Sequence, residues 1–387
     1  MTLTGFSRLA FLTMATTAVL GLMALAVYGP LDTTSAAAQG PRNVTVMVGA
    51  GQDTAVVFGF FPATVRVRAG DTVTWRMNND DLHTVTFMGG TRVEPQAGGV
   101  QDPLGPGGNL IPALVVPQPG GGPQDAMLNP QVAFPTRAPG APVETYSGSG
   151  YVNSGIMEKV SPEPGAPPHD TFSLTFDTPG TYPYLSIILP DRMIGTIEVV
   201  PAGAVDVPDQ AAIDAKANAE MAALLALVDV AKGQGQALAR SEPGPGGSTF
   251  WFVRAGNSDF HSGDLRPHLM EFLPKDITIR AGDTVIWGST LFHTASFVPT
   301  PPLPELVVPV PQPAGPPLLT INPLVATPAK PSAVFDPTQN FNSGLLGPIA
   351  PGGFSWALTF DRPGTFEYAC LVHAQMGMKG TITVVPR

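Results

Sequence analysis

Cysteine, histidine and positive charge are scarce in this chain. Its 387 residues include one cysteine, Cys370, and six histidines. A single cysteine cannot form an internal disulfide, so a ligand role suits Cys370 better than a structural bridge. The 20 Lys and Arg face 30 Asp and Glu, which gives a net charge of -10. An acidic surface argues against nucleic acid as a partner and fits either docking to a basic protein or plain solubility.

Charged residues and helix formers are also few. Only 13% of the residues are charged, whereas the chain holds 44 prolines and 43 glycines. This composition favours turns and strands, so we expect an all-β protein. The length exceeds one usual domain and predicts two, each with its own core.

The first 38 residues are typical of a targeting segment. Arg8 precedes an uncharged run over residues 9–28, and Ala36 to Ala38 offer a small-residue cleavage site. This pattern predicts a signal peptide or, because the apolar run nearly suffices to cross a bilayer, an N-terminal membrane anchor. Either way we expect an exported protein, in the periplasm or on the extracellular face of the membrane.

Residues 368–380 hold the most informative motif. Cys370, His373 and Met378 lie within nine positions, and His293 lies upstream. A thiolate, imidazoles and a thioether suit a soft, redox-active metal such as copper. The alternative is that Cys370 is a buried thiol with no ligand role. Alternating residues predict strands at 276–280, 284–287, 294–297, 356–360, 365–368 and 381–385. The motif therefore falls in the loop between the last two strands, where Met376 competes with Met378 as a ligand.

This region resembles the cupredoxins, the plastocyanin type of blue copper protein. The family pattern is a histidine after a sheet strand, followed by C-x2-H-x4-M before the final strand. The resemblance implies a Greek-key β-sandwich or barrel with one type 1 copper ion held by His293, Cys370, His373 and Met378. It also implies one-electron transfer between redox protein partners. Thr294 stands where plastocyanins often carry asparagine.

The chain contains an internal repeat. Residues 60–75 match residues 272–287, and residues 172–182 match residues 356–366. The repeat predicts two tandem cupredoxin-like domains, at 39–204 and 248–387. We expect a helical linker at 205–247, with one helix over 208–232 that ends at Gly233.

The first copy lacks a complete ligand set. His83 and Met193 stand at two ligand positions, but Ser186 and Leu189 replace the cysteine and the second histidine. A blue copper site needs both missing groups, so we expect no such site there. His83 is then a structural histidine or, alternatively, part of a weak second copper site.

Each copy also carries a Pro/Gly-rich insertion, at 89–170 and 299–353. Shared landmarks such as 128–130 and 321–323 favour an ordered arm, with a loose polyproline-like loop as the alternative.

The remaining histidines have no partner at metal-ligand spacing. We expect His169, His261 and His268 to be surface residues, with a second metal site as the alternative. His373 lies in a loop that we expect to be exposed, so its ring is the expected electron port.

Enzyme function is disfavoured because the chain lacks the histidine patterns of copper enzymes. Laccase-like oxidases use His-x-His pairs, and these enzymes and copper nitrite reductases place a histidine before the blue-site cysteine. This chain has no His-x-His, and Ala369 precedes Cys370. We therefore expect an electron-transfer protein and no enzyme. The alternative is a copper carrier or storage protein, or a surface interaction protein.

Overall fold

The computed structural model describes residues 40–90, 110–122, 125–138, 140–159, 167–238, 240–256, 267–289, 291–347 and 353–387. The chain separates into two units, 1–39 and 40–387, and the account below concerns the second. The expected targeting segment and His261 lie outside the described residues. None of the helices in the described part is both long and apolar enough to cross a membrane.

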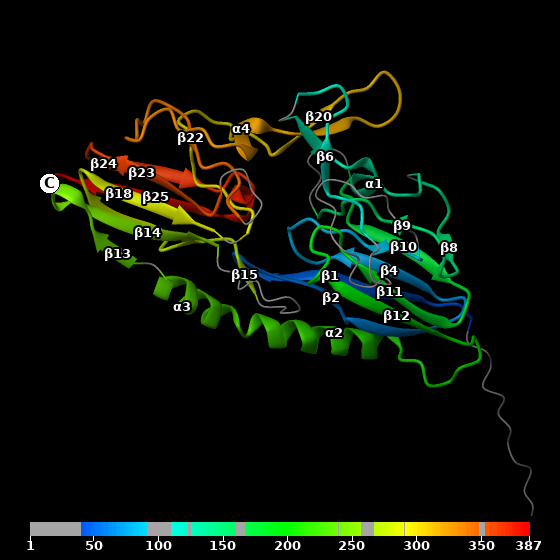
Figure 1. Cartoon of the computed structure of the whole chain (residues 1–387). Coiled ribbons are helices and arrows are strands. Elements are labelled where there is room, and N and C mark those ends of the chain that lie inside the picture. The colour runs from blue at the N-terminus through cyan, green and yellow to red at the C-terminus, as the bar shows by residue number, and fades with distance from the viewer. Residues whose placement is uncertain are drawn as a thin grey trace, which may run out of the picture. The chain divides into compact units, whose positions relative to one another are not determined.

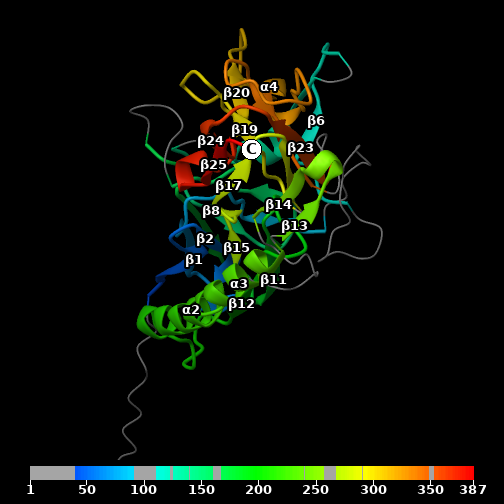
Figure 2. The same ribbon diagram turned by 90° about the vertical axis from the view of Figure 1, so that its left-hand side faces the viewer.

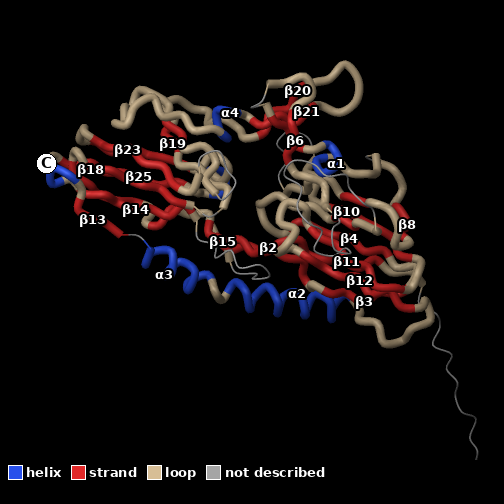
Figure 3. The backbone as a smooth tube through the Cα atoms, viewed as in Figure 1, coloured by secondary structure: helices blue, strands red, loops and turns tan. Residues whose placement is uncertain are grey.

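Strands dominate the structure, as Figure 3 shows in red. The first half of the chain, from β1 to β12, forms two sheets. One has the order β2 (Ala55–Phe61), β1 (Asn43–Gln52), β4 (Thr72–Met77), β10 (Thr171–Phe176), β8 (Glu144–Tyr146). The other has the order β3 (Thr64–Arg68), β12 (Ile194–Val200), β11 (Gly180–Leu185), β5 (Thr86–Phe87), β9 (Val152–Asn153).

The second half, from β13 to β25, repeats this arrangement. One sheet has the order β13 (Arg240–Pro243), β14 (Thr249–Ala255), β18 (Asp283–Gly288), β23 (Ser355–Phe360), and β16 (Phe272–Leu273) also pairs with β14. The other has the order β17 (Asp276–Arg280), β25 (Lys379–Val385), β24 (Gly364–Ala369), β19 (Ser296–Phe297), β22 (Phe341–Asn342). The parallel pair β1 and β4 corresponds to β14 and β18. The expected all-β fold is confirmed, and the two halves share one order of strands.

The core of each half is aromatic and follows from strand alternation. β10 and β23 share one pattern, in which every second residue is buried. Trp75 and Trp287 are fully buried at equivalent strand positions, and their ring centres lie 5.2 Å and 5.5 Å from those of Tyr184 and Tyr368. Large buried rings supply much of the packing area of each core.

Two helices join the halves, α2 (Gln210–Leu225) and α3 (Val228–Leu238). The Asp209 side chain caps α2, which packs on β1 and β2, whereas α3 packs on β14 and a short strand, β15 (His268–Leu269; Figure 1). The expected helical linker is confirmed, but its predicted end at Gly233 is wrong, because the helix is interrupted at residues 226–227 and continues through Gly233. Burial of Val228 and Ala231 offsets the roughly 1 kcal/mol cost of a helical glycine.

Two strands from each insertion form one shared sheet. Its order is β20 (Val307–Val310), β21 (Leu318–Ile321), β7 (Ala126–Leu128), β6 (Val115–Pro117), and Met127 of one insertion pairs with Thr320 of the other. Short helices follow, α1 (Pro130–Ala133) and α4 (Pro323–Ala326), with Asn129 and Asn322 as their caps. In both views this sheet lies on the side opposite α2 (Figures 1 and 2). The geometry favours the ordered arm over the loose loop.

One strand of the second half lies in a sheet of the first. β15 (His268–Leu269) pairs antiparallel with β2, His268 opposite Val56 and Leu269 opposite Ala55. Two 3₁₀ turns complete the described elements, η1 (Pro245–Gly247) and η2 (Ala374–Met376). The halves therefore share a sheet edge close to the motif loop.

Candidate metal centre

The fold brings the four residues of the motif to one end of a sheet. Cys370 directly follows β24, His373 precedes η2, and Met378 precedes β25. His293 lies just before β19, in an isolated bridge with Leu346. His293, Cys370 and Met378 are 0% exposed and His373 is 8% exposed.

Three ligand atoms converge. The Cys370 Sγ lies 3.7 Å from Nδ1 of His293 and 3.5 Å from Nδ1 of His373. The two Nδ1 atoms are 3.0 Å apart, and all three ligand atoms lie within 4.8 Å of one another. A metal bound through bonds of about 2.0 to 2.3 Å fits among atoms at these separations. The donor set, two nitrogens and one sulfur, matches a trigonal copper site.

Met378 is held close to this group by the backbone. The Cys370 N–H donates to the Met378 carbonyl at 3.0 Å, and the Met378 N–H donates to the His373 carbonyl at 3.2 Å. Met378 belongs to the buried core, whereas Met376 is only partly buried against it. The geometry thus favours Met378 over Met376 as the thioether near the centre.

Thr294 supports the cysteine from the strand that carries His293. Its N–H donates to the Cys370 Sγ at 3.3 Å, and its Oγ1 accepts the Leu371 N–H at 2.8 Å. A threonine can therefore orient the sulfur and the loop at the position where plastocyanins often carry asparagine. Such outer contacts set the orientation of ligands.

Burial controls the protonation of the group. It lowers the pKa of His293 well below the ordinary value and lowers the pKa of His373 to about 4. Both imidazoles are therefore neutral, as metal ligands must be. Burial raises the pKa of the Cys370 thiol, although N–H groups of Thr294 and of the loop oppose this shift. The thiol would lose its proton when a metal binds.

A fifth residue at the centre was missed from the sequence. His268 is 1% exposed, and its Nε2 lies 3.0 Å from Nε2 of His293. The expectation of a surface histidine is wrong here, because pairing of β15 with β2 places the ring between the halves. No spacing rule could find it, since the contact depends on strand pairing across the chain. His169, by contrast, is only partly buried, and its Nε2 lies 2.7 Å from the Ser154 carbonyl.

His373 is 8% exposed, so the expectation of an exposed ring is wrong, although Gln375 and Gly377 of the same loop are exposed. Its role as electron port stays a prediction. Thr54, in the turn between β1 and β2, lies over Gly377 of the ligand loop. The N–H of Met270 also donates to the Thr54 carbonyl at 2.7 Å. Phe292, next to His293 in the chain, is 42% exposed and forms a short covalent route from a ligand to the surface.

The equivalent loop of the first half has the same frame with different side chains. The Thr84 N–H donates to the Ser186 Oγ at 3.1 Å, as Thr294 does to the cysteine. Leu189 takes the place of the second histidine, since its N–H bonds the Ser186 carbonyl and its carbonyl accepts the Met193 N–H. Burial lowers the pKa of His83 to about 3.

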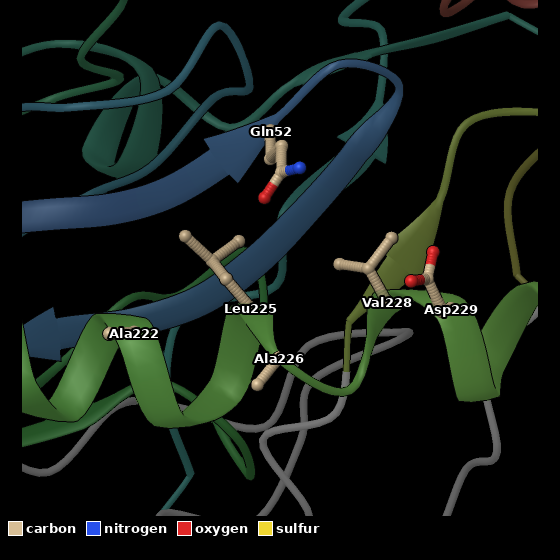
Figure 4. A pocket seen from close by; sticks show the side chains of 6 residues that line it. All are labelled: Gln52, Ala222, Leu225, Ala226, Val228 and Asp229. Atoms are coloured by element: carbon tan, nitrogen blue, oxygen red, sulfur yellow. The ribbon is translucent and has the colours of Figure 1, made fainter.

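A pocket of about 410 Å³ lies elsewhere, where α2 gives way to α3 (Figure 4). Gln52 and Asp229 are its polar side chains, and Leu225 and Val228 line it between them. None of its lining residues is a cysteine or a histidine.

Comparison with known proteins agrees with this geometry. Residues 335–385 match the family model of copper binding proteins, plastocyanin/azurin family, and include Cys370, His373 and Met378. The C-terminal part of the chain thus contains a plastocyanin/azurin-type copper-binding domain, and His293, Cys370, His373 and Met378 form a candidate type 1 copper site.

Several solved structures are similar to this chain. A mutant plastocyanin of fern is 23% identical (TM-score 0.19) and covers 35% of this chain and 99% of its own. A purple cupredoxin from Nitrosopumilus maritimus is 18% identical (TM-score 0.19; 35% and 98%). Amicyanin from Paracoccus versutus is 19% identical (TM-score 0.16; 30% and 74%). No curated protein matches the chain.

Proposed function

We propose that this protein is an exported electron carrier with one type 1 copper ion, bound by His293, Cys370, His373 and Met378. The observation that carries the proposal is the buried convergence of one thiol and two imidazoles in a copper-binding domain. A bound copper ion would supply one-electron chemistry. Rigid strands and hydrogen bonds hold the ligands, which suits rapid electron transfer because little reorganisation is needed.

Each side chain at the candidate copper site has a distinct proposed role. Cys370, His293 and His373 would hold a copper ion through one sulfur and two nitrogens, and Met378 would add a weaker thioether ligand. Thr294 orients the sulfur, and the buried surroundings exclude water. Phe292 is the candidate contact for a redox protein partner, because its exposed ring adjoins His293.

The test is a visible absorption and EPR spectrum of the full chain with one equivalent of Cu(II). We expect an intense cysteine-to-copper band and a narrow copper hyperfine splitting. Cys370→Ser should abolish both while the far-UV circular dichroism is unchanged. Ser186→Ala, the matched change in the first half, should leave both signals intact. A pale spectrum, or a Cys370→Ser variant that stays blue, would refute the proposal.

The finer features of the proposal rest on the sequence. We assign residues 1–38 to export or membrane attachment, 39–204 to a cupredoxin-like domain without copper, 205–247 to a linker and 248–387 to the copper domain. Replacement of two ligands by Ser186 and Leu189 supports a single copper ion. Measurement of one copper per chain by elemental analysis, with a stoichiometry of two as the contrary outcome, tests this point.

The alternative function is copper transport or storage without electron transfer. A carrier must release its metal readily, whereas a buried site with four ligands exchanges metal slowly. Transfer of Cu(I) to a chelator within seconds would favour the carrier, and retention over hours would favour the electron carrier. Catalysis is not part of the proposal.

A further inference from the structure

One side chain, His268 of β15, connects the first half of the chain with the candidate copper site, because its strand pairs with β2. His293 directs Nδ1 toward Cys370 and His373, and its remote Nε2 lies 3.0 Å from Nε2 of His268. The ring centres of His268 and His293 are 5.0 Å apart and their planes differ by 3°. With the nitrogens so much closer than the ring centres, the two rings meet edge to edge. This is the geometry of an N–H···N hydrogen bond.

Metal binding would determine the direction of this hydrogen bond. If Nδ1 of His293 binds the metal, its proton must sit on Nε2, because a neutral imidazole carries one proton. Nε2 of His293 is then the donor and Nε2 of His268 the acceptor. An acceptor at this position fixes the tautomer and ring orientation of the ligand and raises its basicity.

His268 is held in place by both halves. Its backbone pairs with β2, and its ring stacks on Phe58 of β2 with 5.5 Å between ring centres and 30° between planes. Glu271, three residues later, accepts a hydrogen bond from Thr54 and pairs with Lys232 of α3 at 2.9 Å. The acceptor is therefore positioned by the contact between the halves.

The space around Nε2 of His293 is closed on a second side. Gly256 has φ +74°, and a Cβ there would collide with this nitrogen. Its N–H donates to the Glu271 carbonyl at 2.8 Å, which ties it to the strand pair. Gly256 and His268 thus leave His293 little freedom to rotate.

We propose that His268 is a positioning residue of the copper centre, through which the first half of the chain sets the properties of the metal in the second half. This inference rests on the proposed function. A more basic ligand favours Cu(II), so His268 lowers the reduction potential. Removing the acceptor should weaken Cu(II) binding about 10- to 100-fold. If Cu(I) affinity is unchanged, each tenfold loss raises the potential by about 59 mV.

The experiment compares three variants of the full chain, loaded with copper, by redox titration and EPR. His268→Leu removes the acceptor and should raise the potential and change the hyperfine splitting. His268→Gln keeps an oxygen acceptor and should restore most of the wild-type potential. Phe58→Leu removes the ring contact but leaves the hydrogen bond, and should change the potential little.

Two results would overturn the inference. One is an unchanged potential in His268→Leu. The other is an equal shift in His268→Leu and Phe58→Leu, which would assign the effect to packing. The Cu(I) wild type gives a test that needs no variant, because a ¹⁵N–¹⁵N coupling across the hydrogen bond should join His268 and His293. Absence of that coupling would also overturn it. A wild type without a blue spectrum would instead refute the proposed function.

Discussion

The loop after β11 and the loop after β24 have similar backbone hydrogen bonds but different side chains. In both, a threonine N–H reaches the side chain that follows the strand, Ser186 in one and Cys370 in the other. In both, the threonine Oγ1 accepts the next N–H of the loop at 2.8 Å. The hydrogen bonds that hold the loop therefore do not depend on the metal ligands. Exchange of two side chains is the difference between a candidate metal site and a polar core.

The insertions are likewise held by hydrogen bonds that do not involve the candidate ligands. The Nδ2 of Asn153 donates to carbonyls at the end of α1, at 3.0 Å for Gln131 and Val132. Asn342 does the same for α4, at 2.9 Å for Leu324 and 3.0 Å for Val325. Because these amides lie on β9 and β22, each insertion is fastened to its own sandwich. A frame so fully hydrogen-bonded can keep its shape when ligands are lost.

The largest effect should come from rebuilding the missing metal site in the first half. Ser186→Cys with Leu189→His in the Cys370→Ser background should restore a cysteine-to-copper band. Nδ1 of His83 is buried and has no hydrogen-bond partner among the described residues, so it can bind metal. Absorption and copper stoichiometry are the measurements. If this folded variant stays colourless, the two loops are less alike than their hydrogen bonds indicate.

A smaller effect should follow from Gly256→Ala. Both this glycine and Gly90 have φ +74°, but a Cβ at Gly90 meets nothing within 4 Å. Each change should cost about 1–2 kcal/mol of backbone strain. Only Gly256→Ala should also displace His293 and weaken the blue band, because its Cβ collides with Nε2. Urea unfolding and absorption separate the two effects, and equal spectra would contradict the expectation.

The pH dependence of stability should reveal His83. Its pKa is about 3 in the folded protein, against an ordinary value of 6.5, because burial disfavours the charged ring. The unfolded chain binds this proton first, so stability is complete above pH 6.5 and falls as the pH decreases toward 3. The loss should reach about 2 kcal/mol at pH 5.

His83→Gln should remove this part of the acid sensitivity. Urea unfolding of the wild type and variant at pH 7.5 and pH 5 measures the difference. An identical pH dependence of the two proteins would show that the ring is charged in the folded state or that other groups dominate.

The smallest effect should come from the paired threonines. Thr84→Val and Thr294→Val each leave a buried N–H without its acceptor and should cost about 1–2 kcal/mol in the free energy of unfolding. Only Thr294→Val should also shift the reduction potential, since Leu371 adjoins the candidate ligand Cys370. A matching shift in Thr84→Val would mean that the halves are coupled more broadly than through His268.

Local pattern determined much of this protein. Alternating residues and Gly-containing turns located most of the strands around the ligand loop, because a half-buried sheet requires that period. The spacing of Cys370, His373 and Met378 indicated the metal, since three soft donors so close in sequence can meet within one loop. The same loop aligned with residues 186–193 revealed which ligands the first half lacks.

Tertiary structure alone decided how the halves meet. The pairing of β15 with β2 buries His268, and it brings Thr54 of the first half beside Gly377 of the ligand loop. The break between α2 and α3 lies where the packing partners change from β1 and β2 to β14 and β15. Contacts between residues some 200 positions apart leave no period or spacing in the sequence. They depend on shape and hydrogen bonding between surfaces that exist only after each sheet has formed.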